Sequence, residues 1–233
     1  MSLIRTTCPR EFSLHSNTAR GENGMRSNTQ TGLAPLAFKC VIITLMKIVI
    51  LEGIATSGKS TITKVLKRKL QEQGKSVLAV TEEETLMPIL DDTSTKTNLY
   101  RCKELLKKYL NKKSDYIIFD RFYFSHIFRS DSAKASFAEI LSSLQTEDVL
   151  AVLLTIPEEK ISDRIFSSTA HRDPSWEDFI MKKGETREEI AKYYIEQQQI
   201  FTSLFDNTEL RHITIDSSKN NYDELADIIL YSG

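Results

Sequence analysis

The chain has 233 residues, of which 40% are hydrophobic and 27% charged, with 31 basic against 32 acidic side chains and a formal net charge of −1. This length supports one sizeable core, the composition excludes wholesale disorder, and the balanced charge argues against a dedicated nucleic-acid-binding protein. The three cysteines are scattered without a CxxC pair and no apolar run could span a bilayer, which excludes a disulfide framework, a zinc site and a membrane span, and favours a cytoplasmic protein.

Residues 1–45 differ from the rest of the sequence. They are rich in Ser, Thr, Asn and Arg, and they show no helical or strand periodicity before about Ala37. Five basic residues against two acidic ones give this segment a charge of 5 − 2 = +3. It is either a targeting leader, such as a mitochondrial transit peptide, or a segment upstream of a true start at Met46. We therefore expect a non-globular extension over 1–45 and a single domain over 46–233.

Apolar runs alternate with helical patterns from Met46 onward. The expected strands cover residues 47–51, 76–80, 116–119, 149–154 and 212–216. The expected helices cover residues 60–73, 98–110, 132–144, 157–168, 186–205 and 222–231, with Pro157 in the first helical position of its helix. Such alternation predicts an α/β fold in which a five-stranded parallel sheet carries helices on both faces. Ligands of such sheets lie at the carboxyl ends of the strands.

A phosphate-binding motif connects the first expected strand to the first expected helix. The segment matches G-x-x-x-x-G-K-[ST], with glycines at the turn positions, a lysine for the β- and γ-phosphates and a serine hydroxyl for Mg²⁺. The fold is therefore expected to be the three-layer P-loop NTPase fold, binding ATP and Mg²⁺. The expected nucleotide-binding residues are Gly53, Ile54, Ala55, Thr56, Ser57, Gly58, Lys59, Ser60 and Thr61.

A second motif, Asp120-Arg121-Phe122-Tyr123-Phe124-Ser125, ends the third expected strand. A carboxylate at this strand end can hold Mg²⁺ together with Ser60, and Arg121 can contact an acceptor. The alternative is a structural Asp120–Arg121 ion pair. The neighbouring aromatic residues are expected in the core.

The two motifs together resemble those of thymidylate kinases and deoxynucleoside kinases, in which a strand enters E-G-x-x-x-x-G-K-S-T and a later strand ends in D-R-Y-x-x-S or E-R-S. This resemblance implies a P-loop small-molecule kinase. In that group an Arg-bearing lid closes over the phosphates, and it is expected here near residues 164–178, with Arg164 and Arg172 as the catalytic arginines. Two solvated surface arginines are the alternative.

The sequence departs from both families on the acceptor side. The R-E-P-G-G segment of thymidylate kinases is replaced by residues 80–88, which carry Glu82, Glu83 and Glu84. Deoxynucleoside kinases have a general base just after this strand, and we take Glu83 for that role, with Glu82 and Glu84 as alternatives. Three consecutive glutamates are also typical of a solvated loop.

The leading hypothesis is thus an ATP- and Mg²⁺-dependent kinase that phosphorylates a nucleoside, a nucleotide or a similar small molecule. Its catalytic residues are expected to be Lys59, Asp120, Arg121, Glu83, Arg164 and Arg172. The alternative is a P-loop NTPase that acts as a nucleotide-dependent regulator without a small-molecule acceptor. No nucleic-acid or membrane partner is expected, and the oligomeric state is open between a monomer and a homodimer.

Overall fold

A computed structural model describes residues 46–90, 94–130, 137–168 and 174–232. These residues belong to the unit that spans residues 43–233, and the expected extension over 1–45 lies outside the described residues. Five parallel strands form one sheet in the order β2-β3-β1-β4-β5. Their bounds are β1 Lys47–Gly53, β2 Val77–Val80, β3 Tyr116–Asp120, β4 Asp148–Thr155 and β5 His212–Asp216.

The central strands β1, β3 and β4 are nearly continuous apolar runs because helices cover both faces of the sheet. β1 pairs with β3 in a register that places Leu51 opposite Asp120. The carboxyl end of β3 therefore lies beside the start of the phosphate loop. This adjacency brings the two sequence motifs together.

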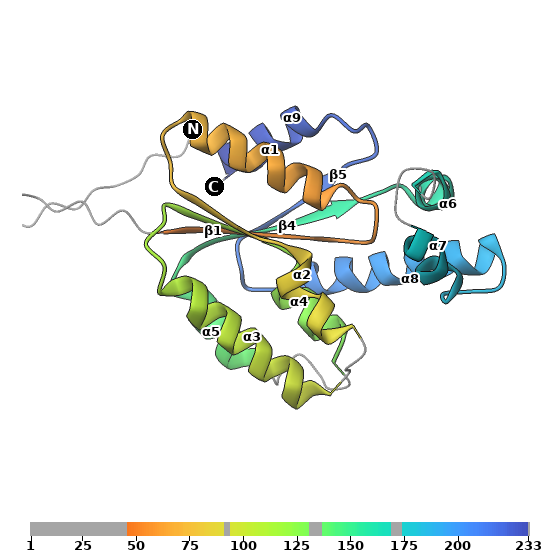
Figure 1. Ribbon diagram of the computed structural model, residues 1–233, viewed down its shortest axis with the longest axis horizontal. Coiled ribbons are helices and arrows are strands. Elements are labelled where there is room, and N and C mark those ends of the chain that lie inside the picture. The colour runs from red at the N-terminus through yellow and green to blue at the C-terminus, as the bar shows by residue number, and fades with distance from the viewer. Residues whose placement is uncertain (1–45, 91–93, 131–136, 169–173, 233) are drawn as a thin grey trace, which may run out of the picture. The chain divides into compact units, whose positions relative to one another are not determined.

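Helices pack on both faces of the sheet. On one face, α1 and α9 lie side by side (Figure 1). Their side chains Ile62, Leu66 and Ile229 are buried against Val49 and the other strand residues on this face of the sheet. On the opposite face, α3, α4, α5 and α8 pack over the alternate strand residues and share a larger aromatic core. The helix bounds are α1 Lys59–Glu72, α2 Glu82–Thr85, α3 Thr95–Leu110, α4 Tyr123–Phe128, α5 Ala138–Gln145, α6 Glu158–Ser167, α7 Pro174–Met181, α8 Arg187–Asp206 and α9 Tyr222–Ser232, with a 3₁₀ turn η1 over Met87–Ile89.

The five expected strands are confirmed to within two residues at either end. The prediction missed the short helices α2 and α4, the 3₁₀ turn η1, and α7, because segments this short carry too little periodicity. The placement of Pro157 in the first helical position was wrong: its ψ of 135° is extended, so Pro157 precedes the helix and Glu158 begins it. Part of the expected helix over 132–144 lies outside the described residues, and the described part runs over Ala138–Gln145. Among the described helices, none has both the length and the apolar character that crossing a membrane requires.

The long helix α8 begins with a capping box, which offers a test of the fold. The Thr186 side chain accepts a hydrogen bond from the Glu189 N–H at 3.2 Å, and the Glu189 carboxylate accepts one from the Thr186 N–H at 3.4 Å. Thr186→Ala should therefore lower the free energy of unfolding by about 1 kcal/mol. Chemical denaturation measures this loss. Ser203→Ala, at an exposed site on the same helix, is the control and should change the unfolding free energy by less than half as much. Equal effects of the two substitutions would contradict the assignment.

Candidate active site

The phosphate loop connects β1 to α1, and its two motif glycines adopt conformations that other residues avoid. Gly53 has φ of 143°, and a Cβ there would lie 2.4 Å from the Leu154 carbonyl oxygen. Gly58 has φ of 92°, and a Cβ there would lie 2.5 Å from the Tyr222 ring. Both positions therefore require glycine, for backbone conformation and for space.

Lys59 places its ammonium group inside the loop. The side chain is buried, and Nζ donates to the carbonyl oxygens of Gly53 at 3.1 Å and Ile54 at 2.8 Å. Burial, together with the neighbouring positive charge of Arg121, lowers the pKa of Lys59 to about 8 against the opposing effect of the nearby carboxylates. A bound phosphate would replace these carbonyl oxygens as the hydrogen-bond acceptor and would give the Lys59 ammonium group a negatively charged partner. Ser60 and Thr61, the next two residues, are exposed, and together with Lys59 they line one cavity.

Ser60 and Asp120, the two residues expected to bind Mg²⁺, meet at the carboxyl ends of β1 and β3. The Ser60 hydroxyl donates to Asp120 Oδ2 at 2.6 Å. The other carboxylate oxygen, Oδ1, is buried and has no hydrogen-bond partner among the described residues. These oxygen donors fit Mg²⁺, which binds through few protein ligands and keeps water and phosphate oxygens in its shell. Among the described residues, no group of three or more His, Cys, Asp or Glu side chains is placed to hold a metal ion.

Arg121 follows Asp120 and forms an ion pair with Glu82, at 3.2 Å from Nε to Oε1. The Arg121 side chain is only 6% exposed, against 37% for Glu82. Its φ of 64° is left-handed, which is uncommon for a residue with a side chain. The alternative of a structural Asp120–Arg121 pair is not observed in the described part of the chain. Arg121 instead joins the end of β3 to the first turn of α2.

The three consecutive glutamates point in different directions because they form one helical turn, α2. The Glu84 carboxylate accepts hydrogen bonds from Lys108 at 2.5 Å and Tyr109 at 2.8 Å, and these bonds lower the pKa of Glu84. Glu83 is exposed. Of the three, only Glu82 contacts Arg121, and only Glu82 lines the cavity that Lys59 and Ser60 also line. The geometry therefore favours Glu82 over Glu83 as the base.

Arg164 lies on α6 and contacts the phosphate loop directly. Its Nε donates to the Thr56 carbonyl oxygen at 3.2 Å, and its Nη2 donates to the Tyr222 hydroxyl at 2.9 Å. The Tyr222 ring in turn packs against Gly58. A guanidinium in this place can reach phosphates held by the loop. Arg172, the second expected lid arginine, lies outside the described residues.

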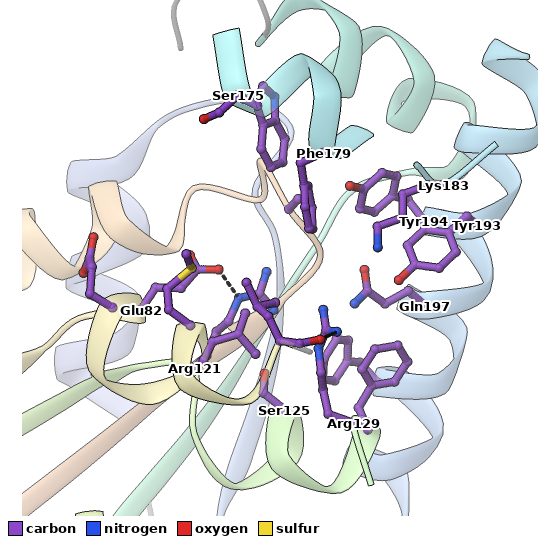
Figure 2. Close-up of a pocket in the computed structure, with 18 residues that line it drawn as sticks. Glu82, Arg121, Ser125, Arg129, Ser175, Phe179, Lys183, Tyr193, Tyr194 and Gln197 are labelled. Atoms are coloured by element: carbon purple, nitrogen blue, oxygen red, sulfur yellow. Dashed lines mark hydrogen bonds and ion pairs between the residues drawn. The ribbon is translucent and has the colours of Figure 1, made fainter. Parts of the chain in front are cut away.

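Two cavities adjoin at this edge of the sheet, and they share Ala55, Glu82, Arg121 and Trp176. The first, of about 610 Å³, extends along the phosphate loop and α6. The second, of about 390 Å³, opens between α2, α4, α7 and α8 (Figure 2). Aromatic side chains line much of the second cavity: Phe128, Trp176, Phe179, Tyr193, Tyr194 and Phe201. Arg129, Lys183 and Gln197 add polar groups to its wall, as Figure 2 shows. We refer to these as the phosphate-loop cavity and the aromatic cavity.

Sequence reasoning missed two parts of this site. The aromatic wall comes from helices that are far apart in the chain, and no local pattern joins them. Phe122, Tyr123 and Phe124 are in the core, as expected, whereas Phe128 is only partly buried and faces the aromatic cavity. The other missed residue is Glu52, a fully buried glutamate at the end of β1. The sequence feature that could have pointed to Glu52 is its position directly before Gly53, the first glycine of the phosphate loop.

Comparisons with known proteins agree with this architecture. The polyphosphate kinase 2 of Arthrobacter aurescens TC1 is similar to the chain with a TM-score of 0.55 and 17% identity, over 81% of this chain and 67% of that one. The chain thus has a three-layer P-loop fold. Shikimate kinase from Acinetobacter baumannii, solved in complex with shikimate, is also similar, with a TM-score of 0.47 and 16% identity over 80% of this chain and 92% of that one.

One family model matches part of the chain. The family is described as chromatin associated protein KTI12, and the match covers residues 46–136. These residues include the phosphate loop, Glu82 and the Asp120–Arg121 strand end. No curated protein matches the sequence significantly. The three-layer P-loop fold expected from the sequence is confirmed, and a specific resemblance to thymidylate or deoxynucleoside kinases is not among these findings.

Proposed function

We propose that this protein is an ATP- and Mg²⁺-dependent kinase that transfers the γ-phosphoryl group to a nucleoside, a nucleotide or a similar small molecule. One observation carries the proposal: the phosphate-loop cavity and the aromatic cavity adjoin, and the residues at their junction include Glu82 and Arg121. A kinase needs its donor and its acceptor in line across such a junction. A nucleotide-binding protein without an acceptor has no need of the second cavity.

On the donor side, the chain supplies charge and backbone groups to a triphosphate. Lys59 leaves the loop carbonyls and pairs with the β- and γ-phosphates, while the start of α1 offers its unpaired N–H groups. Ser60 and Asp120 would hold Mg²⁺, which would neutralise phosphate charge. Arg164, whose Nε is hydrogen-bonded to the Thr56 carbonyl oxygen, adds positive charge to the wall of the phosphate-loop cavity. Arg172 remains a candidate for the same role from the lid segment.

At the junction, Glu82 and Arg121 act on the transferred group. Glu82 accepts the proton of the acceptor hydroxyl as that oxygen bonds to the γ-phosphorus. The bond from the γ-phosphorus to the bridging oxygen breaks, and ADP leaves with that electron pair. Arg121 stabilises the charge on the phosphoryl oxygens as they pass between donor and acceptor. An acceptor that is itself a nucleotide attacks through a phosphate oxygen, and Arg121 then holds that phosphate.

The aromatic cavity supports an acceptor with a flat ring. Trp176 and Phe179 stack at 5.5 Å between ring centroids on α7, and Phe128 and Phe201 lie at 5.2 Å across from α4 to α8. Such rings present faces on which a nucleobase can stack. The Gln197 amide can both donate and accept hydrogen bonds at a base edge. These features match a nucleobase better than a sugar or a simple carboxylic acid.

The only tryptophan of the sequence, Trp176, lines both cavities and makes a direct test available. Titrating the protein with Mg·ATP, and separately with nucleosides and nucleoside monophosphates, should change the Trp176 fluorescence in each case. Lys59→Ala should suppress the change caused by ATP and preserve the change caused by the acceptor. ADP formation is then measured with each acceptor that binds. The proposal fails if no nucleoside, nucleoside monophosphate or related metabolite stimulates ADP formation.

A second candidate is a nucleotide-dependent regulator without a small-molecule acceptor. The observation in its favour is the match of residues 46–136 to a family described as chromatin associated. Such a protein would bind ATP and hydrolyse it slowly, and nucleosides would leave its turnover unchanged. The acceptor-stimulated ADP assay therefore separates the two candidates.

A further inference from the structure

Glu52 is the last side chain before the phosphate loop, and it is 0% exposed. It therefore cannot touch a substrate in either cavity. A fully buried carboxylate is costly unless several partners stabilise it. Burial raises the pKa of Glu52, while a hydrogen bond from the Ser125 hydroxyl and the positive charge of Arg121 act in the opposite direction. The partners of this carboxylate indicate what it does.

Within the described part of the chain, every side-chain hydrogen bond of Glu52 goes to the turn that follows Arg121. Its Oε1 accepts from the Phe122 N–H at 2.9 Å and the Ser125 N–H at 3.1 Å, and its Oε2 accepts from the Ser125 hydroxyl at 2.6 Å. The side chain thus fixes the chain just after Arg121. The Arg121 N–H itself donates to the Leu51 carbonyl oxygen at 2.9 Å, which fixes the chain just before it.

The backbone held between these bonds is strained. Arg121 has φ of 64°, in the left-handed region that a residue with a side chain rarely adopts. Such a backbone persists only where surrounding contacts impose it. The consequence is that the Arg121 side chain leaves the turn toward Glu82, at the junction of the two cavities.

We propose that Glu52 is a positioning residue that ties the phosphate loop to Arg121 and so aims the Arg121 guanidinium at the terminal phosphate of the donor. This inference rests on the proposed function for the role of Arg121. Glu52 also precedes Gly53 directly in the chain, so its backbone is continuous with the phosphate loop. Movement of the loop around a triphosphate is therefore transmitted directly to the turn that carries Arg121.

The test compares the affinities of the full-length protein for Mg·ATP and for Mg·ADP by titration calorimetry. Arg121→Ala should reduce the preference for ATP over ADP by about tenfold or more, because it removes a charged contact to the terminal phosphate. Glu52→Gln keeps the size of the side chain and removes its charge, and it should reduce the same preference by about threefold or more. The double variant should show the same preference as Arg121→Ala alone, since Glu52 acts through Arg121.

Two further variants separate positioning from a simple role in folding. Ser125→Ala removes one of the three bonds to Glu52 and should shift the ATP preference in the same direction by a smaller factor. If Glu52→Gln fails to fold, Ser125→Ala takes its place in the test. Gln198→Ala is the control, because the buried Gln198 amide bonds both backbone groups of Ile156 at 2.8 Å, away from the Arg121 turn. It should lower the melting temperature without changing the ATP preference.

The inference is overturned if Glu52→Gln lowers the melting temperature while the preference for ATP is unchanged. It is equally overturned if Glu52→Gln and Arg121→Ala act additively on that preference, or if Arg121→Ala leaves the preference intact. Because binding alone is measured, a protein that binds ATP but phosphorylates no acceptor would refute the proposed kinase activity and leave this test valid.

Discussion

Lys59→Ala should lower the rate of acceptor-dependent ADP formation by about 100- to 1,000-fold, because it removes the charge that meets the β- and γ-phosphates. In the structure Nζ is surrounded by acceptors of the loop, at 3.1 Å from Gly53 O and 2.8 Å from Ile54 O. The measurement is the steady-state rate at saturating acceptor. The ATP dissociation constant should rise together with the loss of rate.

Lys64→Ala is the matched control for this substitution. Lys64 lies on the same helix α1, but it is exposed and lines neither of the two cavities. Its removal should leave the rate within a factor of about two, as is usual for surface substitutions. Wild-type turnover by Lys59→Ala would remove Lys59 from the mechanism. It would also call for a different phosphate site.

Glu82→Gln should reduce the turnover number by about 100- to 10,000-fold, the range for loss of a general base. The substitution keeps the shape of the side chain and can keep a hydrogen bond to Arg121, but it can no longer accept the acceptor proton. Glu83→Gln should have a much smaller effect, because Glu83 lines only the aromatic cavity and is exposed. The turnover numbers of both variants, measured at saturating ATP and acceptor, decide between the two glutamates.

Glu84→Gln is the control for the other two glutamate substitutions. Glu84 has the same chemistry and the same helical turn, but its carboxylate is bonded to Lys108 and Tyr109 outside both cavities. Its turnover number should stay near the wild-type value. If Glu83→Gln abolishes turnover and Glu82→Gln does not, the assignment made from the structure is wrong and the choice of Glu83 from the sequence is right.

These glutamates illustrate why the sequence could predict carboxylates at the end of β2 but not which of them lines the phosphate-loop cavity. A strand end after Val80 is visible in the apolar pattern, and the carboxylates follow it. The direction of each side chain depends on α2, a single turn of Glu82–Thr85. Because successive residues of a helix point about 100° apart, neighbouring glutamates face different surroundings. A four-residue turn has no periodicity from which this could be read.

The donor side was predictable because its chemistry is local. The spacing of Gly53, Gly58 and Lys59 within one strand–loop–helix segment encodes the phosphate site, and the apolar strands fix where it lies. The register of β1 with β3 then brings Ser60 to Asp120. The pairing order of the strands is set by packing between distant segments. It was therefore not part of the prediction.

The acceptor side depends on tertiary structure throughout. Phe128, Trp176 and Phe201 come from three helices and meet only when α7 and α8 pack against α4. Separately, each ring is indistinguishable in sequence from a core residue. Glu52 was visible in the motif, but its contacts with Phe122 and Ser125 span 70 and 73 residues. Local patterns carry no information over such separations.

The contact of Tyr222 with the phosphate loop has a consequence for protein synthesis. Gly58 packs against the Tyr222 ring, and the Tyr222 hydroxyl accepts the hydrogen bond of Arg164. The phosphate motif is complete at residue 60, but the ring that packs against it lies on α9, which begins at Tyr222. A chain under synthesis on the ribosome therefore carries the complete motif well before Tyr222 has been added. The packing of Gly58 and the hydrogen bond from Arg164 to Tyr222 form only after α9 has docked.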